Sequence, residues 1–189
     1  MSPSKWEQPT VYLQTGDPEA ENNPTLAYPG QLGIRFTMVS PQRSPPLASA
    51  GRSKRYQVVK TDSTMTVSPF PGAVAYWGDK TQYIVTTNSP SVAAERNRVA
   101  GKFSNLVTSG NFTCVQVEGP GIVKLIDAAV QGDVVVGAFV VPSSTNAKAT
   151  VMAANTAPTN TPLGLVASPL SYNAASQEVM VDLNVPETT

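Results

Sequence analysis

Short runs of β-branched residues, each ended by a glycine-bearing turn, constrain the fold of this 189-residue chain more than any other feature. Three such runs, rich in Val, Ile and Phe, follow one another between Arg98 and Val141. They cover Phe112–Glu118, Ile122–Ile126 and Val134–Val141. Gly119-Pro120-Gly121 is predicted to break the first run from the second, because glycine accepts positive φ angles and proline lacks an N–H donor. The stretch holds no comparable run of helix formers, so it predicts a β-meander.

Further β-type runs are expected on both sides of this meander. They are Thr10–Gln14, Gln31–Val39, Arg55–Lys60, Thr64–Ser68, Gly72–Trp77, Thr81–Thr87, Lys148–Ala153, Leu163–Ala167 and Glu178–Val185. Trp77–Thr81 is a hairpin turn signal, and Ser91–Arg96 has room for one helical turn. In the last run the valines and Leu183 occupy every second position, which predicts one buried face. The expected fold is all-β, a sandwich or small barrel spanning residues 51–189.

The first 50 residues differ from the rest because prolines punctuate them. The prolines are Pro3, Pro9, Pro18, Pro24, Pro29, Pro41, Pro45 and Pro46. Proline fixes φ and removes a donor, so a regular helix is not expected here. A disordered tail is one interpretation. We favour a long extended arm over residues 1–50 that becomes ordered on a neighbouring subunit, because aromatic and branched apolar residues recur along it, whereas disordered segments are poor in them.

Charge is scarce and balanced. Charged residues make up 14% of the chain and its net charge is zero, against a usual charged share of about 25% in soluble domains. A surface poor in charge suits a protein that packs against neighbours, and nothing in the global charge favours nucleic acid or membrane as a partner. No apolar run approaches the roughly 18 residues that span a bilayer. The N-terminus lacks the apolar core of a signal peptide, and the one cysteine, Cys114, excludes an internal disulfide.

Basic residues gather between residues 35 and 60, while acidic residues dominate the end of the chain. Such a distribution favours docking between subunits by charge complementarity. The predicted partner contacts combine arm aromatics with this basic block: Trp6, Tyr12, Tyr28, Arg35, Arg43, Arg52, Lys54 and Arg55. Two alternatives stay open for Arg52–Arg55, namely a solvated loop and a nucleic-acid contact. Trp77 is expected in the core or an interface.

The sequence contains few residues or motifs that would indicate an enzyme. The chain has no histidine, which removes Ser-His and Cys-His nucleophile systems and most zinc sites. Glu118, Asp127 and Asp133 are near enough in sequence for a carboxylate pair, but each borders a predicted turn. We therefore predict no catalytic residue, no cofactor and no metal.

The meander also carries a resemblance. The order VTSGNFTCVQVEGPGIVKLIDAAVQGDVVVG, then PLGLVAS and EVMVDLNV, resembles the decoration, or cement, proteins of tailed-bacteriophage heads. YQVVKTDST and GAVAYWGD stand where that family places early strands, so the similarity extends from Tyr56 to Val185. The motifs are short and consist mostly of turn residues. The resemblance implies an all-β protein on the outer surface of the capsid, bound to the major capsid protein and assembled as a homotrimer.

Two functions of different classes follow. The first is a viral structural protein that stabilises the icosahedral shell by bridging capsid subunits, made in the host cytoplasm and carried on the virion. The second is a β-sandwich module of a tail tip or adhesin that binds a host glycan. An exposed aromatic platform would favour the glycan module, and aromatic residues buried between subunits would favour decoration.

Overall fold

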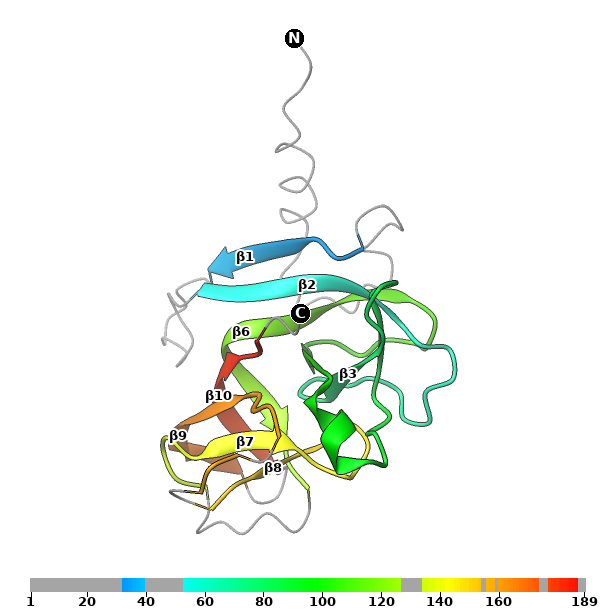
Figure 1. Ribbon diagram of the computed structural model, residues 1–189. Helices are drawn as coiled ribbons and strands as arrows, with labels where there is room; N and C mark the ends of the chain where they lie inside the picture. The colour runs from blue at the N-terminus through cyan, green and yellow to red at the C-terminus, as the bar shows by residue number, and fades with distance from the viewer. Residues whose placement is uncertain are drawn as a thin grey trace.

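The computed structural model describes residues 32–39, 53–126, 134–153, 156–158, 160–173 and 177–186. Its strands are β1 (Arg35–Val39), β2 (Ser53–Thr61), β3 (Val74–Asp79), β4 (Ile84–Thr86), β5 (Val99–Phe103), β6 (Phe112–Lys124), β7 (Phe139–Pro142), β8 (Ala149–Val151), β9 (Gly164–Asn173) and β10 (Glu178–Asn184). One short 3-10 helix, η2 (Ala93–Asn97), lies where a helical turn was predicted. The all-β prediction is confirmed (Figure 1).

Five strands close into a barrel. Their order is β2-β4-β3-β5-β6, and the ring closes because β6 also pairs with β2. The β2–β4 pair is parallel and the other four pairs are antiparallel. β1 lies outside the ring against β2, as the top of Figure 1 shows. Residues 1–31 and 40–52, which hold most of the predicted arm and the run Thr10–Gln14, lie outside the described residues.

β6 extends beyond this barrel and carries a second group of strands. Its first half pairs with β2, and residues 118–124 pair with β10. From β10 the order continues through β9 and β7 to β8, and these strands gather at the lower left of Figure 1. A parallel bridge between Leu125 and Ala149 links β8 back to the end of β6. β6 is therefore the strand that the two groups share.

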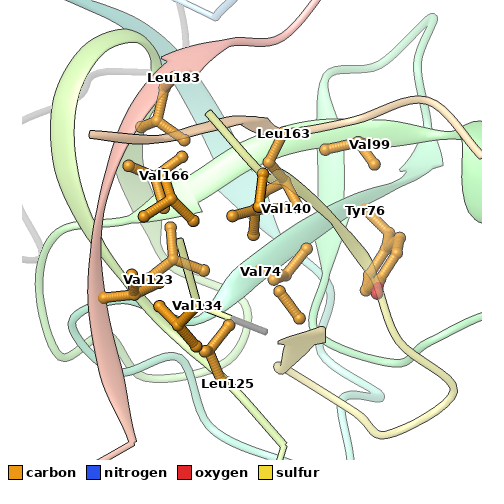
Figure 2. Packing of buried hydrophobic residues seen from close by; sticks show 14 residues of the cluster. Val74, Tyr76, Val99, Val123, Leu125, Val134, Val140, Leu163, Val166 and Leu183 are labelled. Atoms are coloured by element: carbon orange, nitrogen blue, oxygen red, sulfur yellow. The ribbon is translucent and has the colours of Figure 1, made fainter. Parts of the chain in front are cut away.

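The first four residues of β3, Val74–Trp77, lie between two hydrophobic cores, which explains why all four are apolar. Ala75 and Trp77, with Ala73 just before the strand, face the inside of the closed barrel with Val59, Phe103 and Val115. Val74 and Tyr76 point to the opposite side, where Figure 2 shows them beside Val140 and Leu163. A strand covered on both faces needs apolar residues at every position, not at alternate ones.

Three predicted elements differ from the structure, each for a local reason. Gly119-Pro120-Gly121 does not end a strand, because β6 runs through it; Gly119, with φ +88°, directly follows the register shift between Gln116 and Glu118 in the pairing with β2. Thr64–Ser68 is a turn region: Asp62 Oδ1 accepts hydrogen bonds from the Thr64 backbone and hydroxyl, both at 2.8 Å, and such bonds compete with a strand ladder.

The third difference concerns the run Val134–Val141. Only its end belongs to β7, which begins at Phe139. Gly137 adopts φ +82°, and the Ala138 N–H donates to the Val135 carbonyl at 3.1 Å, so a turn precedes the strand. The same geometry leaves Val136 61% exposed. The β3–β4 hairpin is confirmed, although β3 continues to Asp79 and the turn lies over residues 80–83.

Candidate functional site

The predicted contact residues fall into two groups. Trp6, Tyr12, Tyr28, Arg43 and Arg52 lie outside the described residues. Arg35, Lys54 and Arg55 lie on the adjacent strands β1 and β2. The structure thus brings together, across one strand pair, three basic residues that the sequence spreads over about twenty positions.

Within that pair, strand alternation separates the three side chains. Arg35 is paired with Gln57, and Arg55 is two residues from Gln57, so both arginines share one face of the sheet. Lys54 points to the opposite face and is only 4% exposed. Lys54 and Arg55 are the basic residues of the block Arg52–Arg55 that the structure describes, and they therefore do not form one continuous basic surface.

Both arginines on the shared face have defined partners. Arg35 donates to Gln57 Oε1 through Nε at 3.3 Å and Nη2 at 3.2 Å. Arg55 forms an ion pair with Glu118 of β6 at 3.0 Å, with the two side chains 47% and 50% exposed. Such half-exposed charges are accessible to a partner and contribute little to stability.

A wide cleft begins beside this ion pair. It has a volume of about 770 Å³ and runs from Ser53 and Glu118 across β6 and β10 to β9 and β7. Its far wall is apolar, with Phe139, Pro162 and Leu165, and Asp182 adds a second carboxylate to its lining. Sequence reasoning did not find this cleft, because its members come from five strands and one loop that no local pattern connects.

The exposed large hydrophobic residues in the described part of the chain are all aliphatic. They are Ile34, Val92, Leu106, Ile122, Val135, Val136 and Leu165. Ile122 belongs to β6, and Leu165 belongs to β9 and lines the cleft. Tyr56 and Tyr76, in contrast, are 1% and 0% exposed, and Trp77 is 9% exposed.

In the described segments, three titratable groups have a pKa that their surroundings shift. Burial raises the pKa of the Cys114 thiol from 9.0 to about 12 and also raises the pKa of the Tyr76 phenol. The hydrogen bond from the Thr81 hydroxyl lowers the pKa of Asp79. None of the three brings an activated nucleophile or base into the cleft.

No group of three His, Cys, Asp or Glu side chains is arranged to hold a metal ion among the residues that the structure describes. The described segments also contain no helix that is both long and apolar enough to span a bilayer. No protein-family model, curated protein or solved structure matches this chain.

Proposed function

We propose that this chain is a decoration protein of a tailed-phage head, which binds the outer surface of the capsid and stabilises the shell by bridging capsid subunits. The similarity between Tyr56 and Val185 supports the family. The all-β fold agrees with what that resemblance implies. In this proposal the partner is the major capsid protein and the role is structural, without catalysis, cofactor or nucleic acid.

One observation carries the choice between the two functions. The large apolar side chains that are exposed in the described regions are Ile, Leu and Val, whereas Tyr76, Trp77 and Phe103 are buried in the two cores. A glycan module needs flat aromatic faces at its surface on which sugar rings stack. Exposed aliphatic residues instead suit contact with another protein.

We propose that the capsid contacts the face that carries Arg35 and Arg55 and the neighbouring cleft. This face places Arg55 beside the Glu118 carboxylate, at the start of a cleft that also holds Asp182 and an apolar wall. Mixed charge around an apolar centre gives orientation and specificity at a protein interface. In a trimer each contact is weak alone, but the other two hold it at high effective concentration.

Co-sedimentation with empty phage heads tests the proposal. Full-length protein is expected to bind saturably and in a fixed ratio to capsid subunits, and binding should weaken as salt rises. A variant lacking residues 1–31 retains β1, so it tests the arm without removing a strand from the sheet. Binding to host cells or polysaccharide with no affinity for heads would replace the proposal with the glycan module. Equal binding by the truncated variant would keep the structural role and exclude the arm.

A further inference from the structure

The mouth of the closed barrel holds a second, smaller pocket, separate from the cleft. It has a volume of about 330 Å³. Its apolar lining comes from Val99 and Ala100 of β5, Val117 of β6, and Val185 after β10. Mouths of β-barrels are frequent places for small-molecule sites, whose volumes begin at about 300 Å³.

Two aromatic rings stand at this mouth. Trp77 of β3 and Tyr83 of the β3–β4 turn pack edge to face, with ring centroids 6.4 Å apart and an interplanar angle of 66°. Both line the pocket, as does Gly33. A Cβ at Gly33 would collide with Tyr83 Cζ, and Gly33 has a φ of +81°, so glycine is the residue that lets the backbone lie against that ring.

Tyr83 is held in this place at an energetic cost. Its φ of +54° is in the left-handed region, which an aromatic residue rarely adopts. Its carbonyl accepts a hydrogen bond from the Lys60 N–H at 2.9 Å, which anchors the turn to β2. Asn or Gly would adopt this backbone conformation with less strain. The feature that only the tyrosine adds at this position is its aromatic ring. Backbone strain of this kind gathers at binding sites.

Among the residues that the structure describes, the charged side chains that line this pocket are both cations, Arg35 and Lys80. Gln57, also in the lining, accepts two hydrogen bonds from the Arg35 guanidinium and orients it at the pocket. Lys80 is exposed at the start of the turn that carries Tyr83. A guanidinium and an ammonium beside an apolar, aromatic wall match a ligand that is negatively charged at one end and planar at the other.

We infer that the barrel mouth binds a small planar organic anion of the aromatic carboxylate class. The ring of the ligand packs against Trp77 and Tyr83, and its carboxylate faces Arg35 and Lys80. The pocket shares Arg35 with the proposed capsid face, but it is separate from the cleft and is built within one copy of the chain, so free protein without phage heads tests it independently of the decoration role.

A titration with benzoate, followed by the fluorescence emission of Trp77, tests this inference. The chain has two tryptophans, Trp6 and Trp77, so Trp6→Phe leaves Trp77 alone. In that background, benzoate should change the emission saturably with a Kd of about 1 mM or below, as a ligand of this size allows. Benzyl alcohol, which lacks the charge, should bind at least about tenfold more weakly. No saturation with benzoate up to about 50 mM would overturn the inference.

Variants separate binding from folding. Lys80→Gln changes an exposed turn residue and should weaken benzoate about tenfold, whereas Lys148→Gln, which does not line the pocket, should leave the Kd unchanged. Tyr83→Gly removes the ring and releases the left-handed strain, so the far-ultraviolet circular dichroism should be retained while binding is lost. Equal affinity for benzoate and benzyl alcohol, equal affinity for a methyl glycoside, or unchanged binding in both Lys80→Gln and Tyr83→Gly would refute the site.

Discussion

The side-chain amide of Gln116 donates to the carbonyl of Pro120, four residues further along the same strand, at 3.0 Å. The same Nε2 also lies 3.1 Å from the Glu118 carbonyl and 3.2 Å from the Gly119 carbonyl. A single buried amide thus serves the carbonyls of the segment where β6 changes its pairing from β2 to β10. This is how Gly119-Pro120-Gly121 stays within one strand and joins the two groups of strands.

Replacing Gln116 by Leu is expected to destabilise the fold by about 1–3 kcal/mol, because the carbonyls of Glu118, Gly119 and Pro120 would lose this buried donor. Urea unfolding at pH 7 measures it. Glu118→Gln, at a half-exposed position, is the control. Equal unfolding midpoints for the two variants would remove the role assigned to Gln116.

Gly164→Ala should destabilise by about 1–3 kcal/mol or more, because its Cβ would collide with the Asp182 carbonyl oxygen and lie 2.9 Å from Leu183 Cα. This backbone contact cannot move without disturbing the β9–β10 pairing. Gly78→Ala is the matched control, since the nearest atom would be 3.7 Å away. Its unfolding free energy should change by less than about 0.5 kcal/mol. A thermal melt in which both variants behave alike would contradict the close approach.

Cys114 should react slowly with thiol reagents at pH 8. The residue is half-buried, and because burial raises the pKa of its thiol to about 12, little thiolate is present. The rate should be at least about tenfold below that of the unfolded chain in urea, where the full rate returns.

The same pKa shift of Cys114 affects the stability of the fold. Below the unfolded value of 9.0 the thiol is neutral in both states, and between 9.0 and about 12 only the unfolded chain ionises. Stability should therefore fall across that range, and less so in Cys114→Ala.

Arg55→Ala should change the unfolding free energy by less than about 1 kcal/mol, because its ion pair with Glu118 is half exposed. If the β1–β2 face meets the capsid, the same variant should bind empty heads several-fold more weakly, chiefly at low salt. Lys148→Gln, outside that face, serves as the control in both assays. A large loss of stability in Arg55→Ala, or unchanged binding to heads, would contradict this assignment.

Sequence reasoning succeeded where local periodicity decides the outcome. The alternation in Glu178–Val185 predicted a buried face, and Val179, Val181 and Leu183 are 0%, 0% and 3% exposed. Glycine and turn residues predicted the β3–β4 hairpin, with an offset of about two residues. A strand face and a tight turn depend on neighbours within a few positions, so the order of residues contains the information.

Only the tertiary structure decided which strands pair and what each face meets. The sequence Gly119-Pro120-Gly121 predicts a turn. In the structure, the Gln116 amide and the pairing of Pro120 with Asp182 keep this segment extended. Lys54 and Arg55 are neighbours in sequence, yet one is buried and the other half exposed. Gly33, Trp77 and Tyr83 meet at the barrel mouth because β1 and β4 pair with successive parts of the same edge of β2, and β3 pairs with β4. Such meetings depend on long-range closure of the sheet, which the spacing of residues along a chain does not encode.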